Sequence, residues 1–216
     1  MTRRGLRAIY RRLLNQHGPQ AWWPGETVFE VMVGAVLTQN TTWTNVERAL
    51  ARLKQANCLS AAAILACPPG RLAALIRPAG YFNVKARRLK HFCAWYRDNG
   101  EIQRLRYWPT ARLRAGILSV NGVGAETADD ILLYAFNRPV FIVDAYTRRV
   151  FARLGEIAGT EAYEELRARF ERRLAADTAL HKEYHALIVT HGKHLCRPRP
   201  RCEACALARR CPTAPS

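Results

Sequence analysis

The sequence predicts an all-α fold built from two helical lobes, and three observations support that prediction. Apolar residues recur at helical spacing through most of the 216 residues. The alternation of apolar and polar residues that is typical of β-strands is nearly absent. The chain is also long enough for two small lobes. We expect one continuous lobe of six helices over residues 27–138, and a second lobe that joins residues 1–26 to residues 139–216.

Helix-capping signals mark the first elements of the continuous lobe. Thr27 and Glu30 have the spacing of a capping box, and the almost wholly apolar run that follows predicts a buried central helix. Thr44 and Glu47 repeat this spacing and predict a second helix. The other predicted helices are a short one capped by Ser60, one that contains Leu72 and ends at Pro78, one from about Asn83 to Asp98, one capped by Thr110, and four over residues 125–136, 145–154, 160–175 and 178–194.

The segment of residues 140–143 leaves two interpretations open. Its four apolar residues make it the best strand candidate in the chain. They also follow a proline, which favours extended backbone, so a buried connector between helices fits equally well.

The charge of the chain indicates a polyanionic partner. Lys and Arg total 34 against 17 Asp and Glu, which gives a net charge of +17. Such an excess favours nucleic acid through counterion release, but it does not separate DNA from RNA or from an anionic membrane surface. No run of 18 apolar residues predicts a membrane-spanning helix. The N-terminus lacks the apolar stretch of a signal peptide, so we expect a cytoplasmic, nucleoid-associated protein.

The seven cysteines form two groups. Cys58, Cys67 and Cys93 stand in apolar helical patterns, and we expect them to be buried structural thiols. The others lie within residues 196–211. A reducing compartment disfavours disulfides, so this group indicates a metal site, either a [4Fe–4S] cluster or a tetrahedral zinc. Its four candidate ligands are Cys196, Cys202, Cys205 and Cys211.

A glycine-containing turn lies between two of the predicted helices. Gly122 and Gly124 permit a tight turn with positive φ, and the helix that starts at Ala125 leaves backbone N–H groups for a ligand. Such a turn can bind phosphate without any side chain. By spacing alone, an ordinary helix–helix turn is an equal interpretation. The candidate phosphate-binding residues are Asn121, Gly122, Val123 and Gly124.

Four segments together resemble one known family. Residues 118–133, LSVNGVGAETADDILL, resemble the helix-hairpin-helix of the endonuclease III superfamily of base-excision DNA glycosylases. Residues 143–150, VDAYTRRV, resemble the catalytic segment of that family. Residues 37–41 and 80–86 resemble its DNA-facing segments. The resemblance implies a monomer that binds damaged double-stranded DNA between two lobes, with the helix-hairpin-helix over about residues 111–136.

The resemblance also assigns the chemistry. Asp144 matches the catalytic carboxylate of the family, which stabilises an oxocarbenium-like sugar and orients water. It can also cap the helix that follows, and the helix N-terminus would keep it ionised. Glu126 stands where bifunctional members carry a Schiff-base lysine, so the resemblance implies a monofunctional glycosylase. Glu126 either favours the positive end of its helix or positions water or a cationic base. Lys85 or Lys193 could in principle replace the missing amine.

The same resemblance places residues around the flipped base. Gln39 matches the residue that fills the hole left by the nucleotide, and Tyr81, or Phe82 beside it, matches the wedge that opens the stack. The tryptophans resemble the 3-methyladenine glycosylase branch, in which aromatic rings stack on the base. A cationic methylated purine would be attracted by such faces, although packing is the other interpretation for each ring. The candidate pocket residues are Trp22, Trp23 and Trp43.

The cysteine spacing favours the iron–sulfur cluster over zinc once the family is considered. The family usually has six residues in the first gap, and this chain has five.

Taken as a whole, the resemblance implies release of alkylated purines, such as 3-methyladenine, by base flipping and Asp-assisted hydrolysis. A glycosylase for uracil, mismatched thymine or oxidised pyrimidines, with or without lyase activity, is the nearest alternative. A non-catalytic module that binds damaged DNA is the alternative from another class.

Overall fold

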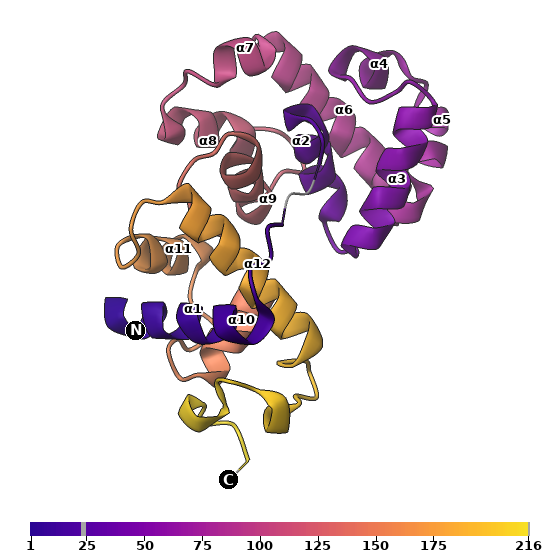
Figure 1. Cartoon of the computed structure of the whole chain (residues 1–216). Helices are drawn as coiled ribbons and strands as arrows, with labels where there is room; N and C mark the ends of the chain where they lie inside the picture. Colours follow the sequence, from indigo (N-terminus) through magenta and orange to yellow (C-terminus); the bar gives the residue numbers. More distant parts are fainter. Residues whose placement is uncertain (23–24, 216) are drawn as a thin grey trace. The chain divides into compact units, whose positions relative to one another are not determined.

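The computed structural model describes residues 1–22 and 25–215 and divides into two compact units (Figure 1). The terminal unit combines Met1–Trp23 with Pro139–Ser216, and the central unit is Pro24–Arg138. Every regular element in the described residues is a helix, so the predicted all-α class is confirmed. No helix in these residues is long and apolar enough to span a membrane.

The central unit is organised around a buried helix. Helix α2 (Val28–Thr38) contacts α3 (Trp43–Gln55) and α6 (Phe82–Asp98), and most of its side chains are buried, as its apolar sequence predicts. Eight α-helices lie in the described part of this unit, two more than the six predicted. The others are α4 (Ala61–Ala66), α5 (Pro69–Leu75), η1 (Arg77–Ala79), α7 (Glu101–Leu105), α8 (Thr110–Leu118), α9 (Ala125–Asp130) and η2 (Ile131–Ala135).

Helix caps agree with the sequence at some positions and differ at others. Thr27 caps α2 and accepts the Glu30 N–H through its hydroxyl at 3.1 Å. Helix α3 instead starts at Trp43, and its N-cap is Thr42, two residues before the predicted cap at Thr44. Thr110 is the first residue of α8 and Pro109 is the cap. In both cases the helix starts earlier than the hydroxyl-bearing residue predicts.

A π-helical turn follows α9 where the sequence predicts one continuous helix over residues 125–136. The Phe136 N–H donates to the Ile131 carbonyl, five residues back, at 3.2 Å. All five residues of this turn, Ile131–Ala135, are buried. Apolar spacing alone cannot distinguish an α-turn from this wider turn, because both bury the same side chains.

A buried lysine fixes the end of α2 to the start of α6. Lys85 is 1% exposed, and its ammonium donates to the Leu37 carbonyl at 2.9 Å and to the Ala79 carbonyl at 2.7 Å. Burial, followed by the nearby positive charge of Arg88, lowers the pKa of Lys85 to about 8. The amine therefore has a structural role within the central unit.

The terminal unit begins with a helix that was not among the predicted elements. Helix α1 (Arg3–His17) is capped by Thr2, and its stripe of Leu6, Ile9 and Leu13 is fully buried. That stripe has helical spacing but is interrupted by arginines, which lowers the mean hydropathy of the segment. The other helices of the unit are α10 (Ala145–Arg153), α11 (Tyr163–Glu171), α12 (Thr178–His194), η3 (Cys202–Ala204) and η4 (Ala208–Arg210).

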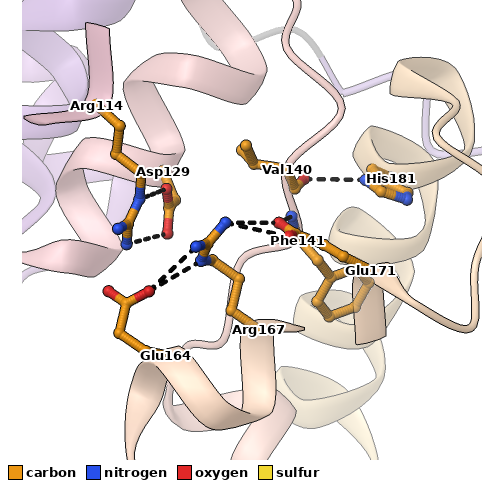
Figure 2. A network of polar contacts seen from close by, with 8 residues as sticks. All are labelled: Arg114, Asp129, Val140, Phe141, Glu164, Arg167, Glu171 and His181. Atoms are coloured by element: carbon orange, nitrogen blue, oxygen red, sulfur yellow. Dashed lines mark hydrogen bonds and ion pairs between the residues drawn. The ribbon is translucent and has the colours of Figure 1, made fainter. Parts of the chain in front are cut away.

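Residues 140–143 form a buried connector without strand pairing. The Phe141 ring stacks on Phe170 with centroids 4.2 Å apart, and its N–H donates to Glu171 at 3.0 Å. Figure 2 shows this contact beside the ion pairs of Arg167 with Glu164 and Glu171. In the central unit, a separate pair joins Arg114 on α8 to the buried Asp129 on α9 at 2.7 Å (Figure 2).

We predict that Gly192→Ala destabilises the protein. Helices α10 and α12 meet at this glycine, and an added Cβ would lie 2.6 Å from a ring atom of Tyr146. Overpacking of this kind costs about 1–3 kcal/mol of the free energy of unfolding. Chemical denaturation would measure the loss. Gly70→Ala is the control, because nothing lies within 4 Å of its Cβ and alanine favours the helix, so it should not destabilise. Equal stability of the two variants would contradict the prediction.

We also predict that Lys85→Met destabilises the protein, because the Leu37 and Ala79 carbonyls would lose their donor. The expected loss is about 1–3 kcal/mol of the free energy of unfolding. The folded pKa near 8 lies below the ordinary lysine value, so burying the charged form opposes folding below pH 8. That penalty fades as the pH rises from about 8 to 10. The melting temperature of the wild type relative to Lys85→Met should therefore increase over this range, and a constant difference would refute the assignment.

Candidate functional site

Asp144 is the N-cap of α10, and its side chain is held by the backbone of that helix. Its Oδ1 accepts the Thr147 N–H at 2.7 Å, so the predicted capping contact is present. The side chain is buried, and its Oδ2 lies 3.7 Å from Nε2 of His185 on α12. This separation is longer than a hydrogen bond and is within the range of an ion pair when the imidazole is protonated.

The surroundings of Asp144 favour its charged form. Burial alone would raise the pKa of this carboxyl, but the facing His185 and the Thr147 N–H together outweigh burial and lower the pKa below its usual value. Asp144 is therefore an anion at neutral pH, even though little of it contacts solvent. A buried, fixed carboxylate can stabilise positive charge on a bound molecule.

His185 links Asp144 to one of the predicted pocket tryptophans. The Trp22 indole stacks on the imidazole with ring centroids 5.8 Å apart and an interplanar angle of 19°. Trp23, the second predicted pocket residue, lies outside the described residues. Sequence reasoning did not select His185, although His181 and His185 lie one helical turn apart on α12 and mark one buried face.

The third predicted pocket residue, Trp43, has a packing contact in the central unit. It is the first residue of α3, and its ring atom Cη2 lies 3.1 Å from where a Cβ on Gly34 would be. The glycine in α2 therefore provides the space that this half-buried indole fills. This contact supports the packing interpretation that the sequence left open.

The predicted phosphate-binding turn connects α8 to α9. Gly122 has a φ of +90°, as the turn requires, and a Cβ at this position would lie 2.4 Å from Cγ of Arg88. Gly124 is different from the prediction: it is the N-cap of α9 with an extended backbone that any residue can adopt. Nothing lies within 4 Å of its Cβ position, so the space beside the turn is open at this residue. Asn121 is exposed and Val123 is buried.

Gln39 is engaged with this turn within the central unit. Its Nε2 donates to the Gly122 carbonyl at 3.1 Å and to the Thr127 hydroxyl at 3.0 Å, and Arg88 donates to its Oε1. The next residue, Asn40, is exposed and has a φ of +54°. Sequence reasoning did not single out Asn40, because only the backbone conformation distinguishes it from its neighbour.

Tyr81 has the geometry expected of an inserting side chain, whereas Phe82 does not. Tyr81 is 72% exposed and adopts a left-handed backbone with a φ of +44° just before α6. Such a conformation is costly for a tyrosine and is often retained for function. Phe82 is half-buried, with the Arg77 guanidinium 5.9 Å from its ring centroid.

Glu126 is exposed in the first turn of α9, which fits both interpretations of its role.

The four C-terminal cysteines line one cavity in the terminal unit, with a volume of about 30 Å³. Helix α10 holds the loop that carries them. Arg149 donates to the Cys196 carbonyl at 2.8 Å, and Arg153 donates to the Arg197 and Pro198 carbonyls at 2.6 and 2.9 Å.

All seven cysteines are free thiols. Cys58, Cys67 and Cys93 are buried in the central unit, as predicted. In the described residues, no three His, Cys, Asp or Glu side chains are close enough to hold a single metal ion.

Comparisons with known proteins agree with this geometry. Residues 33–176 match the family model of the HhH-GPD superfamily base excision DNA repair proteins. A protein of Methanocaldococcus jannaschii, which its name assigns provisionally to the DNA repair glycosylases, is 48% identical over 206 residues, covering 94% of each chain.

Solved structures extend the agreement to the fold. A non-covalent endonuclease III–DNA complex has a TM-score of 0.85 at 23% identity, covering 99% of this chain and 97% of that chain. The H. pylori 3-methyladenine DNA glycosylase bound to 1,N6-ethenoadenine has a TM-score of 0.73 at 30% identity, covering 88% of this chain and 95% of that chain. The chain belongs to the HhH-GPD superfamily of base excision DNA repair glycosylases, as the sequence motifs predict.

Proposed function

We propose that this glycosylase is monofunctional and removes alkylated purines, such as 3-methyladenine, from double-stranded DNA. The observation that carries the proposal is the buried anionic carboxylate of Asp144, fixed by the start of α10. The glutamate at position 126, where a Schiff-base amine would stand, supports the monofunctional part of the proposal.

In the proposed mechanism, residues of the central unit bind and open the duplex. In the central unit, the turn around Gly122 binds a backbone phosphate through N–H groups, and the exposed Tyr81 enters the base stack. Asn40 fills the space left by the flipped nucleotide more readily than Gln39, whose amide would first have to break its bonds to Gly122 and Thr127. Contacts between these side chains and the neighbouring bases replace part of the stacking that is lost, so they offset part of the free energy that base flipping costs.

Asp144 then acts on the sugar of the flipped nucleotide. The bond between C1′ and the base nitrogen breaks, and its electron pair leaves with the base, which becomes neutral if it was an alkylated cation. The carboxylate stabilises the positive charge that develops on the sugar, and a water molecule adds to C1′ while a proton passes to Asp144 or to solvent. An abasic site with an intact strand is the product.

The substrate part of the proposal rests on Trp22. Its indole stacks on the ring of His185, which faces the Asp144 carboxylate. A flipped base could lie against the aromatic face of this indole. A cationic purine would gain from the aromatic face and from the anion. The structural likeness to the H. pylori 3-methyladenine DNA glycosylase supports the same class. Trp43 adds less support, because it packs on Gly34.

We predict that the purified protein releases 3-methyladenine from methylated duplex DNA, measured by chromatography of the free bases. Asp144→Asn should lower the single-turnover rate by at least about 10²-fold while the duplex still binds. Asp98→Asn is the control, since this carboxylate is exposed in a surface pair with Arg97. Borohydride treatment should trap no covalent adduct with DNA.

Other results of this experiment would redirect the proposal. Release of uracil, mismatched thymine or an oxidised pyrimidine, but no methylated purine, would contradict the substrate class and leave the role of Asp144 intact. A trapped adduct would contradict monofunctional chemistry. Tight binding of damaged duplexes without release of any base would support the non-catalytic module.

We also propose that Cys196, Cys202, Cys205 and Cys211 hold a [4Fe–4S] cluster, with zinc as the alternative. Four thiols on one cavity provide the ligand set of such a cluster, and Arg149 and Arg153 fix the backbone around it. The bound cluster would supply structural cross-linking of the C-terminal loop. Arg149 and Arg153 would keep that loop beside α10, whose N-cap is Asp144.

We predict that the protein as isolated is brown, with broad visible absorbance and iron and sulfide in equal amounts. Cys202→Ser should lose most of this absorbance, because one ligand is removed. The control is Cys58→Ala, at a buried thiol of the central unit, which should keep the full absorbance. Metal analysis that finds zinc and no iron in the wild type would contradict the cluster.

A further inference from the structure

The imidazole of His185 contacts two different candidate functional groups. This residue lies on α12 and is 5% exposed. One edge of the ring, at Nε2, lies 3.7 Å from Oδ2 of Asp144. One face of the ring stacks on Trp22, with centroids 5.8 Å apart and planes inclined by 19°. A single side chain therefore separates the carboxylate from the indole, and its shape sets the distance between them.

The carboxylate needs a second contact to have a fixed orientation. The Thr147 N–H donates to Oδ1 at 2.7 Å, and the Thr147 side chain also acts on the carboxyl group and lowers its pKa. The terminal torsion of an aspartate is broad, so a contact at Oδ2 restrains the carboxylate further. His185 faces that second oxygen. Contacts around catalytic groups are often long before the substrate binds and shorten afterwards, so a separation of 3.7 Å is compatible with an orienting role.

The same helix also determines where Trp22 lies. The segment before the indole is bonded to α12 at two points: the Gln20 N–H donates to Glu183 at 2.6 Å, and the Thr190 hydroxyl donates to the Gln20 side chain at 2.7 Å. These contacts lie on either side of His185 along the helix. His185 lies on this helix and the segment before Trp22 is bonded to it, so both members of the stacked pair are held by one rigid element, as a preorganised site requires.

We propose that His185 is a positioning residue that sets the carboxylate of Asp144 at a fixed distance and angle from the base-stacking face of Trp22. The proposal rests on the proposed glycosylase function. In that reaction, the base and the sugar carbon belong to one nucleotide. An aromatic face that fixes the plane of the base assists the reaction only if the carboxylate is also fixed relative to that face. His185 serves both requirements, with its ring edge toward Asp144 and its ring face toward Trp22.

The two contacts can be separated by substitution. His185→Phe keeps a flat aromatic face for Trp22 but removes the N–H that faces Asp144. His185→Gln keeps an N–H near the position of Nε2 but removes the aromatic face. His185→Ala removes both. His194→Ala is the matched control, because that histidine is exposed at the end of the same helix. Thermal melting of each variant identifies those that fold like the wild type.

The measurement is kcat and KM for base release under matched conditions. We expect His185→Phe to lower kcat by roughly 10-fold or more with KM within about twofold of the wild type. His185→Gln should raise KM several-fold with a smaller change in kcat, and His185→Ala should show both effects. A merely structural role would lower both parameters in parallel with the melting temperature. That parallel loss, or unchanged kinetics in all three variants, would overturn the proposal.

A spectroscopic measurement tests the stacking contact independently of activity. The near-ultraviolet circular dichroism of Trp22, obtained as the difference between the wild type and Trp22→Phe, should persist in His185→Phe. It should decrease in His185→Gln and His185→Ala. An unchanged signal in His185→Ala overturns the proposal even when the enzyme is active. A wild type that releases no base overturns the proposed function, and with it this inference. The two failures are therefore distinguishable.

Discussion

The terminal unit depends on helix α10 being fixed at both of its ends. Asp144 caps its first turn through the Thr147 N–H, and the arginines of its later turns donate to carbonyls of the cysteine loop. Since α10 is rigid, the loop and the carboxylate have a fixed spatial relation. A cross-linked loop would therefore contribute to the position of Asp144 without taking any part in electron transfer, and the proposed cluster would need no redox role.

The N-terminus of α10 also resolves a conflict at Asp144. A dry, enclosed carboxylate interacts strongly with a developing positive charge, but enclosure favours its protonated form. The imidazole of His185 and the Thr147 N–H together outweigh burial, so the pKa of Asp144 is below its ordinary value. Capping and proposed catalysis therefore share one contact: the Thr147 N–H that starts the helix acts together with His185 to keep the carboxylate charged.

Sequence periodicity predicted those features that depend on local chemistry. The apolar run after Thr27, the positive φ at Gly122 and the capping position of Asp144 all follow from neighbouring residues. The features that were missed depend on tertiary contacts. His185 is recognisable only because α12 packs against α10, and the side chain of Gln39 is engaged only because the α8–α9 turn lies within its reach. Helix α1 had a sequence signal in the spacing of its buried stripe, which its arginines obscured.

Lys85 illustrates why a shifted pKa does not identify a nucleophile. An amine with a pKa of about 8 has the property expected of a Schiff-base lysine. Yet its ammonium donates to both the Leu37 and the Ala79 carbonyl, and 1% of the residue is exposed. Attack on a sugar would require the amine to leave both carbonyls unpaired, which costs about 1–3 kcal/mol for each. The shift results from burial in a structural position. Glu126 cannot form the Schiff base either, so neither residue provides a reactive amine, and water is the nucleophile that fits the proposed monofunctional chemistry.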